Sequence, residues 1–283
     1  MKKYALSILF LFIITLVSCN GAGTNVEQAG NGDMKKDTVA VAERSVATGN
    51  AAVVDLVFKK EFPLDSVGSN SPVMNVDIVL PVASGGTAIA HSINREIVYA
   101  ALDCYADTPE DAVAMFVNSR LAEYNDNYPQ YVNVKEIDGS HNRLNFNYDI
   151  KGRLVSDHGG RLCFRIDRIT YEGGAHGLES TYYLTFDSRS GKLITLDDIF
   201  TDDYSGTLCD ILVAALARKL GVEGIDEVKS LGYLYDMDMY PTSNFRLDND
   251  SILFYYNSYE IAPYALGHTR IVIGYNELKD ILK

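Results

Sequence analysis

The chain is short of positive charge. It has 25 Lys and Arg residues against 38 Asp and Glu residues, which gives a formal net charge of −13 at pH 7. An acidic surface of this kind repels nucleic acid and anionic lipid head groups, and it attracts cationic proteins. The charge balance therefore argues against a nucleic-acid-binding role and favours protein or glycan partners.

Cysteine is also scarce, with four residues in the whole chain. One of them, Cys19, belongs to the N-terminal segment discussed below. Cys104, Cys163 and Cys209 are an odd number, so they cannot all pair within one chain, and their spacing matches no metal site. Three buried thiols are favoured over one disulfide with a free thiol, because Cys104 and Cys209 lie among apolar residues of expected helices.

Long apolar runs are absent after residue 18. The one run in the chain, from Tyr4 to Val17, is shorter than the roughly 20 residues that span a bilayer. Lys2 and Lys3 precede it, and Leu16-Val17-Ser18-Cys19 ends it. This order is typical of a bacterial lipoprotein signal peptide over residues 1–18.

Such a signal predicts cleavage before Cys19 and lipidation of its thiol, with palmitate among the acyl groups. The protein is then exported and held on a bacterial membrane by the lipid alone, facing the periplasm or the cell surface. Plain secretion and an uncleaved anchor remain alternatives. Residues 19–51 have no aromatic residue and no sustained periodicity, which predicts a flexible tether.

Apolar periodicity after the tether predicts an α+β fold of two small domains, with mostly antiparallel sheets and a few packed helices. Apolar residues spaced by four predict a helix over 89–104, and Thr108-Pro109 predicts the start of a second helix. Further helices are expected over 208–221 and from residue 276. Strands are expected at 52–58, 73–80, 132–134, 144–150, 162–166, 182–186, 193–196, 245–247, 252–256 and 270–273, with a bulge at 168–169.

Three glycines surround one histidine in Tyr171-Glu172-Gly173-Gly174-Ala175-His176-Gly177. A phosphate loop is not indicated, because no Lys-Ser/Thr ending and no following helix accompany the glycines. His176 as a general base beside Glu172, or as a metal ligand, would need partners that no motif supplies. The pattern favours a histidine that hydrogen-bonds the turn, and it predicts no cofactor and no metal.

Acidic and aromatic residues gather in the second half of the chain. The pairs Asp197-Asp198 and Asp202-Asp203 precede an expected helix and are interpreted as caps. A cluster of aspartates lacks the spacing of a calcium loop and is interpreted as solvated turns; its members are Asp236, Asp238, Asp248 and Asp250. The tyrosines between 233 and 264 suit sheet packing or a contact face for sugar or protein.

Three motifs in order make the second half similar to a known family. They are 171–177; Thr185-Phe186-Asp187 with Ser190-Gly191-Lys192 and Leu196-Asp197-Asp198-Ile199-Phe200; and Tyr259-Glu260-Ile261-Ala262-Pro263-Tyr264-Ala265 with Gly267. Together they resemble the C-terminal domain family of the RsiV anti-sigma factor, a domain of unknown function (3298), over residues 166–283. Residues 52–165, with Ser92-Ile93-Asn94, resemble the PdaC-like partner domain (4163) that precedes it.

This resemblance implies a two-domain α+β fold without catalytic residues of its own. In the anti-sigma factor the same domains bind lysozyme, so the expected function is a lipid-anchored binding module for a lysozyme-like cationic protein or for peptidoglycan glycan. The motif residues are expected either to shape the turns or to bind the partner. They are Tyr171, Gly173, Gly174, His176, Gly177, Tyr259, Glu260, Pro263 and Tyr264. The alternatives are an envelope hydrolase that uses His176 and a scaffold for other envelope proteins.

Overall fold

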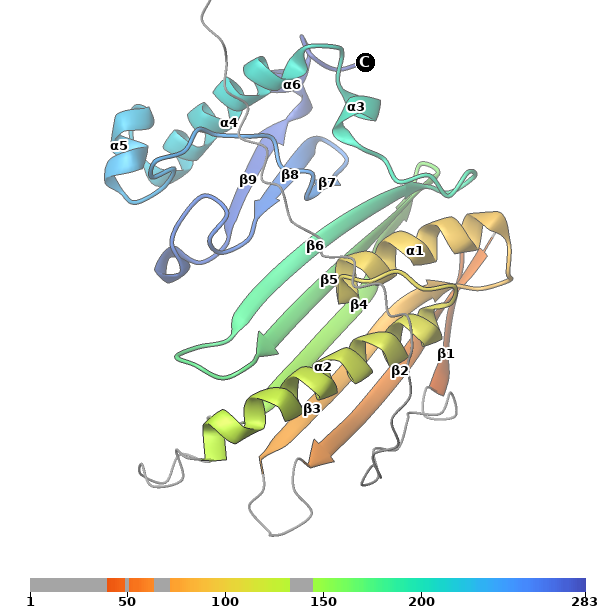
Figure 1. Cartoon of the computed structure of the whole chain (residues 1–283). Coiled ribbons are helices and arrows are strands. Elements are labelled where there is room, and N and C mark those ends of the chain that lie inside the picture. Colours follow the sequence, from red (N-terminus) through yellow and green to blue (C-terminus); the bar gives the residue numbers. More distant parts are fainter. Residues whose placement is uncertain (1–39, 49–50, 64–71, 133–144) are drawn as a thin grey trace, which may run out of the picture. The chain divides into compact units, whose positions relative to one another are not determined.

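The first part of the chain builds a six-stranded sheet in the order β1-β2-β3-β4-β5-β6 (Figure 1). The computed structural model describes residues 40–48, 51–63, 72–132 and 145–283, which all belong to one compact unit within residues 34–283. Neighbouring strands are antiparallel except β3 and β4, which are parallel. The strands are β1 (Ala40–Thr48), β2 (Ala51–Pro63), β3 (Val73–Ala83), β4 (Phe146–His158), β5 (Arg161–Tyr171) and β6 (Leu178–Asp187).

Two helices, α1 (Ala88–Leu102) and α2 (Pro109–Val132), lie between β3 and β4 in sequence and pack on one face of this sheet (Figure 1). A parallel strand pair needs such a long crossover. The expected apolar stripe is buried, since Ile93, Ile97 and Ala101 are all 0% exposed. The Thr87 side chain caps α1 by accepting a hydrogen bond from the amide of Ala90 at 3.1 Å.

The second part builds a three-stranded antiparallel sheet, β7-β8-β9, with its own core. Helix α4 packs on β9 and supplies three fully buried leucines, Leu208, Leu212 and Leu216. The strands are β7 (Phe245–Leu247), β8 (Ser251–Tyr256) and β9 (Thr269–Gly274). The helices are α3 (Leu196–Ile199), α4 (Tyr204–Leu220), α5 (Ile225–Ser230) and α6 (Tyr275–Leu278), with a 3₁₀ turn η4 (Tyr264–Leu266).

Two buried asparagines join the second part to the edge strand β6. The Asn244 side chain accepts from the amide of Tyr183 at 2.8 Å and donates to the carbonyl of Thr181 at 2.7 Å. The Asn257 side chain accepts from the amide of Thr181 at 2.7 Å. These amide side chains satisfy backbone groups that an edge strand would otherwise leave unpaired. A small apolar cluster accompanies them: Cys163, Tyr183, Leu253 and Tyr255.

The α+β prediction with mostly antiparallel sheets is confirmed. The tether prediction is wrong for residues 40–48, which form β1 on the edge of the sheet. A strand there needs only backbone pairing with β2, so a composition without aromatic residues does not prevent it. Residues 1–39, which include the predicted signal peptide, Cys19 and the start of the tether, lie outside the described residues.

Several other boundaries in the structure differ from those predicted from the sequence. The predicted domain limit at residue 166 falls inside β5, and the two large cores divide between Phe186 and Leu196. The register shift lies in β4 between Leu154 and Ser156 rather than at 168–169. Residue 132, expected to begin a strand over 132–134, ends α2, and the rest of that expected strand lies outside the described residues. After β6 the expected hairpin is reduced to one bridge, between Phe186 and Leu193.

The caps and thiols agree with the sequence in part. Asp198 caps α3, since its carboxylate accepts from the Thr195 amide at 2.9 Å, whereas Asp203 precedes α4 without a side-chain capping bond. Cys104, Cys163 and Cys209 are free thiols, but only Cys163 is fully buried. Across the part of the chain that is described, no helix has both the length and the apolar character needed to cross a membrane.

Candidate functional site

Two of the predicted motifs meet in space. The 171–177 motif connects β5 to β6, and the 259–267 motif connects β8 to β9. The His176 ring stacks on the Tyr264 ring with centroids 3.8 Å apart and an interplanar angle of 11°. The Tyr259 ring also stacks with the Tyr264 ring, and their centroids are 5.7 Å apart. We call His176, Tyr259 and Tyr264 the aromatic junction.

Glycines shape the loop that carries His176. Gly173 and Gly174 have φ of 87° and 90°, a backbone conformation that residues with a side chain rarely adopt. The Tyr171 hydroxyl donates a hydrogen bond to the Gly174 carbonyl at 3.0 Å. A Cβ at Gly177 would lie 2.7 Å from the Thr170 carbonyl oxygen, so a close backbone approach requires glycine there. His176 Nδ1 lies 2.9 Å from the Gly177 carbonyl. His176 thus hydrogen-bonds the turn, as the sequence predicts.

A tight turn presents the two tyrosines. The Glu260 carboxylate accepts from the Asn257 amide at 3.0 Å, and burial raises the pKa of Glu260. Tyr259 has φ of 72° and is 59% exposed, with its amide bonded to the Ala262 carbonyl at 3.0 Å. Pro263 precedes the 3₁₀ turn that holds Tyr264. A tyrosine held in the left-handed region and exposed to solvent is the kind of strain that gathers at binding surfaces.

Glu172, the carboxylate suggested as a partner for His176, makes its contacts elsewhere. It accepts a hydrogen bond from the Tyr148 hydroxyl at 2.8 Å and lies 3.5 Å from the Arg120 guanidinium. Burial, followed by this bond, raises the pKa of Tyr148. Within the described ranges, no group of three or more His, Cys, Asp or Glu side chains is arranged to hold a metal ion.

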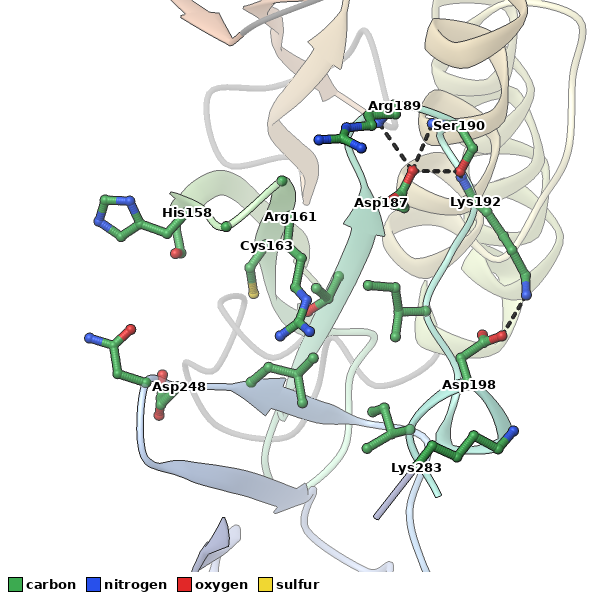
Figure 2. A pocket seen from close by; sticks show the side chains of 18 of the residues that line it. His158, Arg161, Cys163, Asp187, Arg189, Ser190, Lys192, Asp198, Asp248 and Lys283 are labelled. Carbon is green, nitrogen blue, oxygen red and sulfur yellow. Dashed lines mark hydrogen bonds and ion pairs between the residues drawn. The ribbon is translucent and has the colours of Figure 1, made fainter. Parts of the chain in front are cut away.

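A second site was not predicted from the sequence. A cleft of about 970 Å³ lies among the β4–β5 turn, the turn after β6, α3, the β7–β8 turn and the last residues of the chain (Figure 2). Four basic residues line it: Arg161, Arg189, Lys192 and Lys283. The sequence singled out some of its members, but as separate features: Ser190-Gly191-Lys192 as part of a family motif, Asp198 as a cap and Asp248 as a solvated turn. Residues from five separate segments form this wall, so no local pattern could reveal it.

The family and structural comparisons agree with the fold. Residues 197–276 match the family described as "Protein of unknown function (DUF3298)". The chain is 25% identical over 231 residues to the peptidoglycan-N-acetylmuramic acid deacetylase PdaC of Bacillus subtilis (strain 168). That match covers 80% of this chain but only 45% of the relative, so the chain spans less than half of PdaC.

Two crystal structures of DUF3298 proteins resemble the fold. One, from Bacteroides fragilis NCTC 9343, has a TM-score of 0.71 and 28% identity, covering 83% of this chain and 95% of that one. The other, from Pseudomonas aeruginosa PAO1, has a TM-score of 0.53 and 16% identity, covering 82% and 94%. Residues 197–276 are therefore similar to the DUF3298 family, and most of the chain has a fold similar to that of a solved DUF3298 protein.

Proposed function

We propose that the protein is an exported, lipid-anchored binding module of the bacterial envelope, and that the aromatic junction takes the glycan of peptidoglycan. Cys19 would carry the lipid, and the folded part would present the junction to the wall. In this proposal the module performs no reaction of its own.

The observation that carries the proposal is the aromatic junction itself. Two motifs far apart in the sequence place His176, Tyr259 and Tyr264 in one stack, with His176 and Tyr259 exposed. Aromatic rings pack well against the C–H faces of sugar rings, and the tyrosine hydroxyls and histidine nitrogens can hydrogen-bond sugar hydroxyls. The similarity to a deacetylase named for peptidoglycan supports this class of ligand.

A lysozyme-like cationic protein is the second candidate. The net charge of −13 favours it, and the segment around residue 234 meets the 259–267 motif, since the Leu234 amide donates to the Ile261 carbonyl and a Cβ at Gly232 would contact Leu266. Leu231, Tyr235 and Leu266 are 47%, 78% and 41% exposed, and Asp226 and Asp236 are exposed beside them in the sequence. Such a surface would bind a cationic partner in a salt-sensitive way.

Calorimetry can test both ligands with the full chain in detergent micelles. Peptide-free peptidoglycan glycan fragments should bind saturably, and Tyr264→Ala and His176→Ala should each weaken binding about tenfold or more. Tyr105→Ala removes an exposed tyrosine that is also stacked on another ring, outside the junction, and it should leave the affinity unchanged. An equal loss in all three variants, or no heat from the glycan, would exclude the proposal.

A parallel titration with lysozyme at two salt concentrations tests the second candidate. One-to-one binding that weakens with salt supports it. The hydrolase alternative predicts that His176→Ala abolishes turnover of wall fragments without lowering stability. The scaffold alternative predicts coprecipitation of another envelope protein, with no affinity for glycan or lysozyme.

A further inference from the structure

The cleft of Figure 2 is lined by more basic than acidic side chains, although the chain as a whole is acidic. Arg161, at the start of β5, points into the cleft, while the Nζ atoms of Lys192 and Lys283 lie on the other side, where they bond Asp198 and the Asp197 carbonyl (Figure 2). Arg189 lies at the rim. Four basic side chains in one cleft are notable in a protein with a net charge of −13.

The carboxylates of the cleft are engaged within the protein. Asp187 accepts from the Ser190 amide and from the Ser190 hydroxyl, both at 2.8 Å, and so holds the turn after β6. Both oxygens of Asp248 accept from Arg246 at 2.8 Å. Asp198 accepts from Lys192 Nζ at 2.6 Å as well as from the Thr195 amide.

Arg161 differs from Lys192, which is paired with Asp198. It lies opposite Asp187 in the β5–β6 register, but the two side chains turn apart, and the Asp187 carboxylate faces its own turn (Figure 2). Within the described residues, no carboxylate forms an ion pair with Arg161. Lys283 Nζ donates to the Asp197 carbonyl, which leaves its positive charge without a carboxylate partner.

We propose that this cleft binds an oxyanion, and that its ligand is a carboxylate of a wall peptide; the identity of the peptide rests on the proposed function. A guanidinium offers paired N–H donors that match a carboxylate in a bidentate way. Arg161 would make this contact, and Lys283 would add charge from the other side of the cleft, whereas Lys192 stays paired with Asp198. A volume of about 970 Å³ accommodates several peptide residues rather than a single ion.

The test uses the full chain in detergent micelles and a pentapeptide with two free carboxylates. Its amidated counterpart has the same shape without the charges, and inorganic phosphate serves as the third probe. The free-acid peptide should bind saturably, and the amidated peptide should not. Arg161→Ala should weaken the affinity about tenfold or more, because a charge-assisted contact is lost.

Arg153→Ala is the matched control. Arg153 is an exposed arginine on β4, outside the cleft, where it pairs with Asp167 at 3.0 Å. This variant removes the same charge and should bind the peptide as the unaltered chain does. Circular dichroism of both variants should match the unaltered chain, because both side chains are exposed.

Each outcome decides the proposal. Equal weakening in Arg161→Ala and Arg153→Ala would mean diffuse attraction and would overturn the site, as would binding of the amidated peptide. Binding of phosphate but not of the peptide, sensitive to Arg161→Ala, would keep the oxyanion site and overturn the peptide as its ligand. The two proposals can also fail separately. If the unaltered chain binds no glycan but binds the peptide, and Tyr264→Ala does not weaken peptide binding, the cleft proposal stands and the glycan proposal fails.

Discussion

Gly191 is fitted closely against the first turn of α1. Its φ is +71°, and a Cβ there would lie 2.8 Å from the Ile89 carbonyl oxygen and 3.0 Å from the Ile89 Cα. Both neighbours are backbone atoms and cannot move aside cheaply. We expect Gly191→Ala to lower the free energy of unfolding by about 2–4 kcal/mol, from left-handed strain and overpacking together. Urea unfolding followed by circular dichroism measures this change.

Gly221 is the control for that prediction. Its φ is +72°, but nothing lies within 4 Å of the position its Cβ would take. Gly221→Ala should therefore cost only the conformational part, about 1 kcal/mol. Equal losses in the two variants would show that the close approach to Ile89 contributes nothing.

At the scale of elements, two amide side chains bond the edge of β6, and Asn244 makes two of their three bonds to it. Asn244 is 8% exposed, and its side chain bonds the Tyr183 amide and the Thr181 carbonyl. Asn244→Ala would leave both backbone groups unpaired in the interior. We expect a loss of about 2–4 kcal/mol in the free energy of unfolding, since each buried unpaired group costs about 1–3 kcal/mol.

The comparison for this variant is Asn249→Ala. Asn249 is exposed in the turn between β7 and β8, so its removal should change stability by less than about 0.5 kcal/mol. Amide exchange of Tyr183 gives a second measurement, because its protection depends on the Asn244 oxygen. Unchanged protection of that amide in Asn244→Ala would contradict the assigned role.

The cap of α3 makes stability depend on pH. The bond from Lys192, followed by the bond from the Thr195 amide, lowers the pKa of Asp198 from 3.8 to about 2. Because the folded pKa lies below the unfolded one, the stabilisation is complete above about pH 4 and is lost as the pH falls toward 2. Asp198→Asn should cost about 1 kcal/mol at pH 6, allowing for solvent screening.

The difference between Asp198→Asn and the unaltered chain should then shrink as the pH approaches 2. Urea unfolding at several pH values between 6 and 2 measures it. Lys192→Ala should reproduce part of the effect, since it removes the largest cause of the lowered pKa. A difference that stays constant across this range would contradict the capping argument.

Local patterns predicted the elements whose side chains alternate between core and solvent. The stripe of Ile93 and Ile97 predicted α1, and Thr108-Pro109 predicted the start of α2. β1 was not predicted in this way, because residues 40–48 have no sustained periodicity and their pairing with β2 is made by the backbone. The parallel pairing of β3 with β4 also depends on how the helices pack, which no single segment encodes.

At the scale of the whole molecule, the sequence indicated which motifs matter but not that they touch. Glycines and tyrosines marked 171–177 and 259–267 separately, and the stack of His176 on Tyr264 exists because β6 lies beside the loops of the second sheet. The cleft has the same origin, since Arg161 and Lys283 line it although they lie far apart in the sequence. Contacts of this range follow from the tertiary fold rather than from local spacing.

The same contacts predict that the two sheets unfold together. The edge of β6 is bonded by Asn244 and Asn257, and Tyr183 and Tyr255 are buried beside them. Unfolding the second part alone would expose the β6 edge and the shared apolar cluster to water, which makes a half-folded state unfavourable. We therefore expect β3 and β9 to lose hydrogen-exchange protection at the same urea concentration, as measured by mass spectrometry.

A core substitution makes this prediction decisive. Phe254 is 0% exposed in the second core, and Phe254→Leu should lower stability by about 1 kcal/mol or more. If the sheets are coupled, this variant shifts the urea midpoint of β3 as much as that of β9. A shift confined to β9, with β3 unchanged, would show that the predicted two domains are independent, and the β6 contacts would then contribute little to their coupling.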